Sequence, residues 1–183
     1  IWRAGVAAVL PERLIQSQVH LEGGWLTVGD ESIDLRNIER IAIVGGGKAA
    51  GAMARALEKL LGSKLLAEKN VTGWVNVPAD CVAPELAYSL LERGQGDGLP
   101  RVRLHPGRPA GVNEPRPEGV FGMQRILEIV SSLGTKDLCF CVLAGGGSAL
   151  LPAPVPEISL DDKICVTRLL SGAGANIEQL NAV

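Results

Sequence analysis

Two runs of three glycines, each placed directly after an apolar segment, constrain this chain more than any other feature. The first lies in "IAIVGGGKAA", from Ile41 to Ala50, and the second in "CVLAGGGSAL", from Cys141 to Leu150. Glycine adopts backbone angles that other residues avoid, and it lets main-chain N–H groups approach a neighbour without an intervening Cβ. We therefore expect each triplet to form a tight turn between a strand and a helix.

The rest of the chain alternates strand-like and helix-like segments. Continuous apolar runs at 40–44 and 137–144 predict buried strands, and further strands are predicted at 72–77 and 101–104. Strands that alternate with helices are typical of an α/β fold with a mostly parallel, Rossmann-like sheet and helices on both faces. Two short runs, "WLTVG" and "SIDL", predict a small β-hairpin near the N-terminus, at the edge of that sheet.

Several helices can be bounded by their end signals. A short helix is predicted from Ile1 to Val9. Two further helices are predicted to begin at capping pairs. One pair is Ser159 with Asp162, and the other is Asn176 with Gln179. Gly172 is predicted to end the first of these. The helix after the proline-rich turn is expected to bury four residues on its inner face: Val120, Met123, Leu127 and Val130.

Composition excludes several function classes. Hydrophobic residues make up 46% of the chain, so it can bury a globular core, and a net charge of -2 gives no electrostatic footprint for nucleic acid. No apolar run approaches the ~18 residues that a membrane span needs, so we expect a cytoplasmic protein. The two histidines and the four cysteines, none in a C-x-x-C pair, do not predict a metal site.

The turns predict an anion site. In a parallel α/β sheet, ligands bind beyond the carboxyl ends of the strands, where both triplets are expected. Lys48 would add a positive charge beside the first triplet and Ser148 a hydroxyl beside the second. A lysine in the first turn of a helix opposes the helix dipole, which favours an anionic partner. The alternative is that each triplet is only a strand-to-helix turn.

Three familiar motifs fit incompletely. A Walker P-loop is excluded, because Ala42 stands where its first glycine belongs. The dinucleotide fingerprint G-x-G-x-x-[G/A] fits Gly45, Gly47 and Ala50, but the acidic residue expected at the end of the next strand is missing. A nucleophile elbow G-x-S-x-G fails at Leu150.

Taken together, "VGGGKAAGAMARALE", "LHPGRP", "AGGGSALLPAPVPEISLDDK" and "TRLLSGAGANIEQLNAV" resemble the type II glycerate 2-kinase family. The resemblance covers nearly the whole chain in order. It implies that ATP, with Mg²⁺, phosphorylates D-glycerate to 2-phosphoglycerate in a cleft between two α/β domains. Residues 1–183 would then be most of the N-terminal domain of a longer enzyme, and the second domain would be absent from this chain.

The resemblance also implies roles for particular residues. Lys48 falls on the family's catalytic lysine. The "E-x-N" element of the family falls on Glu178 and Asn181. The two glycine turns would bind phosphate or substrate through Gly45, Gly46, Gly47, Gly145, Gly146, Gly147 and Ser148.

The sequence departs from the family at two places. Ala144 replaces a usual serine, and "HPGRP" replaces "HPVPD", so that Arg108 and Pro109 stand where proline and aspartate are usual. Arg108 is either an exposed turn residue or a carboxylate-binding one. His105 is either a strand-end histidine bonded to the backbone or a site residue, and no general base is evident in the chain.

Two other functions remain open at this stage. One is an NAD(P)-dependent hydroxypyruvate reductase, and the other is a non-catalytic sensor of anionic metabolites. Tartronate or another small hydroxyacid is an alternative acceptor. The oligomeric state is open as well, with a homodimer among the options.

Overall fold

The computed structural model describes residues 1–82 and 101–182, so most of the loop-rich stretch predicted from Pro78 to Pro100 lies outside it. At its centre is a four-stranded sheet in which every pair of neighbouring strands is parallel. The strand order is β6-β5-β4-β7, with β4 at Arg40–Gly46, β5 at Thr72–Pro78, β6 at Val102–Arg108 and β7 at Asp137–Leu143.

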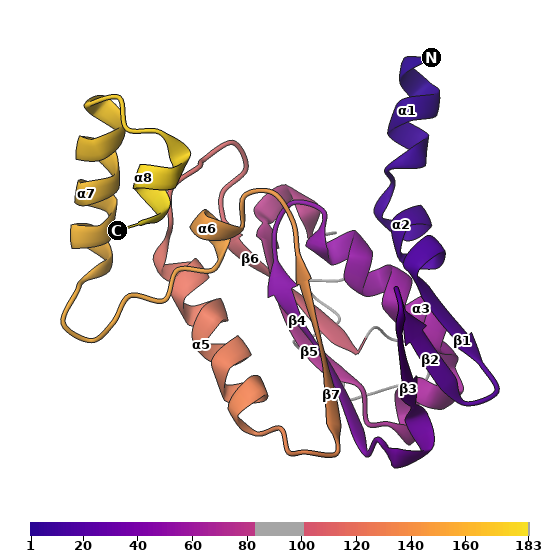
Figure 1. Ribbon diagram of the computed structural model, residues 1–183. Coiled ribbons are helices and arrows are strands. Elements are labelled where there is room, and N and C mark those ends of the chain that lie inside the picture. Colours follow the sequence, from indigo (N-terminus) through magenta and orange to yellow (C-terminus); the bar gives the residue numbers. More distant parts are fainter. Residues whose placement is uncertain (83–100, 183) are drawn as a thin grey trace.

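Helices cover both faces of this sheet (Figure 1). On one face, α3 (Ala50–Glu68) packs on the strands, with α2 (Pro11–Gln18) against it. On the other face, α5 (Pro117–Ser131) packs on β4, β5 and β6. Ile43 points into the core beneath α3, whereas its neighbour Val44 packs under α5. This alternation is the expected result of a strand buried on both faces, and the predicted α/β fold is confirmed.

A second, antiparallel sheet precedes the first. It contains β1 (Val19–Glu22), β2 (Trp25–Val28) and β3 (Glu31–Asp34) in that order. The predicted hairpin is confirmed as β2 and β3, but it belongs to this separate sheet and not to the edge of the parallel one. The predicted first helix is α1 (Trp2–Ala8), and two short 3₁₀ turns occur at Leu35–Asn37 and Ala79–Cys81.

The predicted inner face of α5 is wrong for two of its four residues. Met123 packs against the core and Val120 is half-buried, as predicted for this face. Leu127 and Val130 are exposed, and the buried residues are Gly119, Gly122 and Ile126. A Cβ at Gly122 would lie 2.0 Å from Oδ1 of Asn76 on β5. The helix therefore approaches the sheet along its glycines, and apolar periodicity did not reveal that close approach.

The prediction that residues 137–144 form a strongly buried strand also needs correction. In the described residues β7 pairs only with β4 and forms an edge of the sheet. Its residue Val142 is buried, but Cys139, Cys141 and Leu143 are exposed. An apolar run alone does not distinguish a central strand from an edge strand.

Three helices follow β7. They are α6 (Gly147–Leu150), α7 (Leu160–Gly172) and α8 (Ile177–Asn181). Both predicted capping boxes are present, with Ser159 at the start of α7 and Asn176 at the start of α8. None of the helices in the described residues has the length and apolar composition that a membrane crossing requires.

Candidate functional site

The two glycine turns lie side by side at the carboxyl end of the sheet, because β4 and β7 are neighbouring strands. Two main-chain hydrogen bonds join them. The N–H of Ala144 donates to the carbonyl of Gly46 at 3.2 Å, and the N–H of Lys48 donates to the carbonyl of Gly145 at 3.0 Å. The structure thus brings together two sequence motifs that lie far apart in the chain.

Glycine is required in the first turn by this close approach. A Cβ at Gly45 would lie 1.9 Å from the carbonyl oxygen of Val142, and one at Gly47 would lie 2.5 Å from that of Ala144. Both residues also have positive φ angles, 149° and 135°, which other residues rarely adopt. By contrast, nothing lies within 4 Å of a Cβ placed at Gly145.

The two turns differ in which main-chain N–H groups are available. In the first turn, Gly45 to Gly47 are buried, and the N–H of Gly47 already donates to the carbonyl of Asn76 at 3.1 Å. In the second turn, the N–H groups of residues 145–148 donate to no acceptor in the described structure. Gly145 and Ser148 are exposed. The second turn therefore has N–H groups free for an anion, and anion binding by Gly45, Gly46 and Gly47 stays a prediction.

Two cations lie beside the second turn. A Cβ at Gly146 would be 3.2 Å from Nη2 of Arg108 and 3.9 Å from Cε of Lys48. Lys48 is exposed, whereas Arg108, at the end of β6, is only 3% exposed. Neither side chain forms an ion pair with a carboxylate in the part of the chain that the structure describes. This end of the sheet therefore carries positive charge without an internal counter-ion from those residues.

Asn76 holds this end of the sheet together, and the sequence analysis missed it. It is fully buried on β5, where the indole N–H of Trp74 donates to its Oδ1 at 3.0 Å. Its Nδ2 donates to the carbonyl oxygens of Gly119, at 3.1 Å, and Leu150, at 2.7 Å. The side chain thus connects β5 to α5 and to α6. A buried asparagine in an apolar strand was the available signal.

A cavity of about 720 Å³ opens beside the second turn. Gly146 and Ser148 line it on one side, and Lys163 and Thr167 of α7 line it on another. Ile177 and Leu180 bring α8 to the same cavity.

The "E-x-N" residues are less well placed. Glu178 is exposed and is not among the lining residues. Asn181 ends α8, but its side chain lies outside what the structure describes. Their predicted roles stay predictions.

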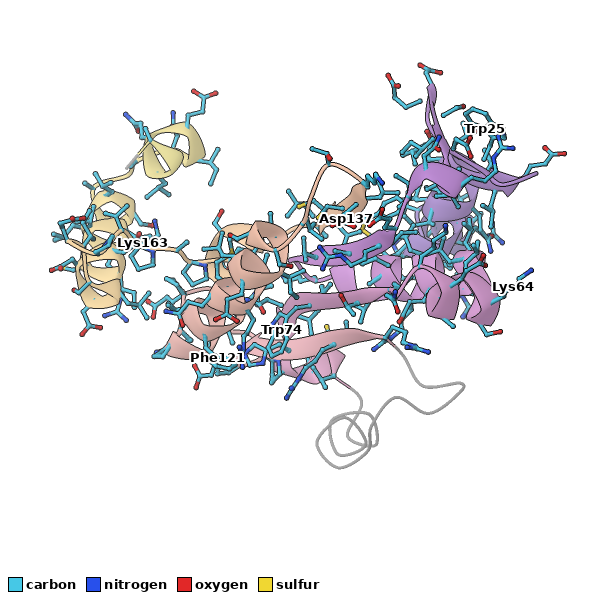
Figure 2. The ribbon with its side chains drawn as sticks, turned by 90° about the horizontal axis from the view of Figure 1, so that it is seen from below. Trp25, Lys64, Trp74, Phe121, Asp137 and Lys163 are labelled. Atoms are coloured by element: carbon cyan, nitrogen blue, oxygen red, sulfur yellow. The ribbon has the colours of Figure 1, made fainter. Side chains whose placement is uncertain are left out.

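His105 has the structural role that the sequence analysis gave as one alternative. Its Nε2 forms a hydrogen bond with the main-chain carbonyl of Glu118, with 2.9 Å between the atoms. The ring packs against Trp74 and Phe121, which lie next to each other between β5 and α5 (Figure 2). Burial lowers the pKa of His105, partly offset by the bond to Glu118. The ring is therefore held in its neutral form within an aromatic cluster.

Cys81 lies beside the main chain of Lys48. Its Sγ is 3.9 Å from the carbonyl oxygen of Lys48. Burial raises the pKa of the Cys81 thiol, and the nearby Asp80 acts in the same direction, while Arg108 and Lys48 act against them.

The described residues do not build an all-protein metal site. No group of three or more His, Cys, Asp or Glu side chains that could hold a metal ion occurs among them. Mg²⁺ usually keeps water ligands and binds through one or two carboxylates together with substrate phosphates.

Comparison with known proteins agrees with the resemblance seen in the sequence. The chain is 35% identical over 187 residues to the glycerate kinase of Bos taurus, an alignment that covers 100% of this chain and 34% of the relative. It is 28% identical over 185 residues to D-glycerate 2-kinase of Thermotoga maritima, covering 100% of this chain and 36% of the relative. The chain thus spans about a third of the length of the curated relatives it matches.

The fold has a counterpart among solved structures. The crystal structure of glycerate kinase from Thermotoga maritima matches with a TM-score of 0.67 and 26% sequence identity, over 99% of this chain and 35% of that chain. All of residues 1–183 also match the protein family described as "Domain of unknown function (DUF4147)". The predicted resemblance to glycerate kinases is confirmed over the length of this chain, and the chain belongs to the DUF4147 family.

Proposed function

We propose that this chain is part of an ATP-dependent kinase that phosphorylates D-glycerate to 2-phosphoglycerate. The single observation that carries the proposal is the position of Lys48 beside the free N–H groups of residues 145–148. The similarity to glycerate kinases supports the choice of substrate. The named relatives act in chains about three times as long, so we propose that a second α/β domain completes the cleft.

In the proposed reaction a hydroxyl oxygen of D-glycerate attacks the γ-phosphorus of ATP. The bond from that phosphorus to the bridging β–γ oxygen breaks, ADP leaves with that oxygen, and the hydroxyl proton is released to water. Catalysis of such a transfer consists mainly of positioning and of neutralising charge on the phosphoryl oxygens. In this proposal the ammonium of Lys48 neutralises the negative charge on the phosphoryl oxygens. The N–H groups of Gly145, Gly146 and Gly147 and the Ser148 hydroxyl donate hydrogen bonds to those oxygens.

The first turn has a supporting part in this proposal. Gly45 and Gly47 allow β4 and the first turn to approach Val142 and Ala144, and Gly46 leaves room for Leu151. This packing fixes the start of α3 and with it Lys48. Phosphate contacts from these three glycines, and substrate contacts from Glu178 and Asn181, remain predictions. Mg²⁺ would enter bound to the ATP phosphates and would neutralise part of their charge. A cytoplasmic location belongs to the same proposal.

The hydroxypyruvate reductase alternative is not favoured. The buried Asn76 lies near the end of β5, the strand after the fingerprint glycines, and its side chain already bonds to Trp74, Gly119 and Leu150. It therefore cannot take the place of the acidic residue that holds a nucleotide ribose. The named relatives reported above are kinases.

The test is ADP release by the full-length protein with D-glycerate, ATP and Mg²⁺, in a coupled assay. The kinase proposal expects turnover that requires D-glycerate. Oxidation of NADPH with hydroxypyruvate, and no ADP release, would favour the reductase. Binding of ATP or glycerate without either reaction would favour a metabolite sensor.

A further inference from the structure

Arg108 is a buried cation whose hydrogen bonding is incomplete. The side chain lies at the carboxyl end of β6 and is 3% exposed. Its Nη1 donates to the carbonyl oxygen of Val112. Its Nε and Nη2 atoms are buried and have no hydrogen-bond partner in residues 1–82 and 101–182. Buried charged groups are normally paired, so two unpaired nitrogens on one guanidinium require an explanation.

A purely structural role explains only part of this arrangement. The bond from Nη1 to Val112 holds the loop that leads from β6 to α5. It leaves the opposite edge of the guanidinium, formed by Nε and Nη2, without a function. The exposed turn arginine considered in the sequence analysis is therefore excluded, because the residue is buried.

The unpaired Nη2 atom lies beside the second glycine turn. Nη2 would be 3.2 Å from a Cβ built on Gly146, and the same Cβ would be 3.9 Å from Cγ and Cε of Lys48. Gly146 has a φ angle of 86°, so a side chain there is disfavoured by the backbone as well. The guanidinium, the lysine stem and the second turn thus converge on one small region.

Two other arginines of this chain bind carboxylates through their Nε–Nη2 edge. Nε and Nη2 of Arg168 donate to the two carboxylate oxygens of Glu114, both at 2.8 Å. Arg36 holds Asp34 in the same way, at 2.8 and 2.9 Å. A planar fork of two parallel N–H donors matches the two oxygens of a carboxylate. Lysine offers only a compact point charge and has no such preference.

We propose that the Nε–Nη2 edge of Arg108 binds the carboxylate of the hydroxyacid acceptor, beside Lys48 and the second glycine turn. The identity of that acid as the phosphoryl acceptor rests on the proposed function; the carboxylate site itself does not. Arg108 then fixes one end of the acid, which leaves Lys48 for the transferring phosphoryl group.

The experiment compares Arg108→Lys and Arg108→Gln with wild type in the full-length protein. Arg125→Lys is the matched control, because Arg125 is exposed on α5 and pairs with Glu128 outside the site. For Arg108→Lys we expect the KM for D-glycerate to rise about 10- to 100-fold, while the KM for ATP changes less than about twofold. Arg108→Gln should raise the KM for D-glycerate further than Arg108→Lys does. The control should behave as wild type.

Calorimetric titration of D-glycerate separates this inference from the kinase proposal, because it needs no turnover. If wild type binds D-glycerate without phosphorylating it, and Arg108→Gln abolishes binding, the carboxylate site stands and the kinase proposal is wrong. If wild type is a kinase and both variants keep its KM for D-glycerate, the carboxylate site is wrong. Absence of D-glycerate binding to wild type contradicts both.

Two further outcomes would overturn the inference. A rise in the KM for ATP alone would assign the guanidinium to a phosphate of the nucleotide. If Arg108 had only a structural role, its substitutions would lower the melting temperature of the ligand-free protein. The extra stability gained on binding D-glycerate would then be the same as in wild type. We expect a different pattern for Arg108→Gln. Without ligand its melting temperature stays near that of wild type, because the lost bond to Val112 is offset by removal of an unpaired buried charge, and D-glycerate no longer stabilises it.

Discussion

The main-chain N–H of Lys48 donates a hydrogen bond to the carbonyl oxygen of Gly145, with 3.0 Å between the two atoms. This bond ties the start of α3 to the second glycine turn. It sets the lysine next to N–H groups that have no acceptor in the described structure, so a cation and hydrogen-bond donors are available together for a phosphoryl group.

The first prediction concerns the contact between the turns. Gly45→Ala should lower the free energy of unfolding by roughly 3 kcal/mol, because its Cβ would overlap the carbonyl of Val142 and its φ is positive. Gly145→Ala is the matched control, since a Cβ there meets nothing within 4 Å. We expect the control to change stability by less than ~0.5 kcal/mol. Urea denaturation of the full-length variants measures both, and equal losses would contradict the packing argument.

A second prediction concerns Asn76. Asn76→Ala removes three hydrogen bonds and leaves the Trp74 indole and two main-chain carbonyls buried without partners. The expected loss is roughly 3 kcal/mol. The exposed Asn37 forms only a long bond to Asp34, at 3.4 Å, so Asn37→Ala should cost less than ~0.5 kcal/mol. Denaturation midpoints compare the two, and a tolerated Asn76→Ala would show that α5 and α6 are held by other contacts.

The aromatic cluster predicts a pH effect. Burial lowers the pKa of His105, so the folded protein binds the proton less readily than the unfolded chain, whose histidines titrate near ~6.5. The stability contributed by the neutral ring is present above that pH and is lost as the pH falls from about 7 to 5. His105→Gln, which keeps a donor for the Glu118 carbonyl, should reduce this loss.

The control for that experiment is His20→Gln, at an exposed position of β1. Melting temperatures of the full-length proteins are measured across the pH range. If His105→Gln and wild type lose stability in parallel, the buried ring does not cause the pH effect.

Much of the fold was accessible from the sequence, for identifiable reasons. The run from Ile41 to Val44 is apolar on both faces of a strand, and Ser159 with Asp162 gives a local capping signal. Such signals depend on neighbours in the chain. The inner face of α5 was mispredicted because it depends on Gly122 meeting Asn76, a contact between distant segments.

The site was predictable to a similar extent. The glycine turns and Lys48 have visible motifs, and their meeting follows once β4 and β7 are known to be neighbours. The sequence did not reveal that the N–H of Gly47 in the first turn is already hydrogen-bonded, whereas the N–H groups of the second turn are available to a ligand. That difference depends on which carbonyl each N–H meets in the folded chain. Arg108 was left ambiguous for the same reason, since burial and unpaired nitrogens are properties of the folded chain.

The most direct test of the central claim is the steady-state rate of ADP release by full-length Lys48→Ala with D-glycerate and ATP. Lys64→Ala is the control, because Lys64 is exposed on α3 and far along that helix from the turns. The account predicts that kcat falls ~100-fold or more for Lys48→Ala, with an unchanged melting temperature, while the control keeps wild-type turnover. Wild-type turnover by Lys48→Ala would contradict it.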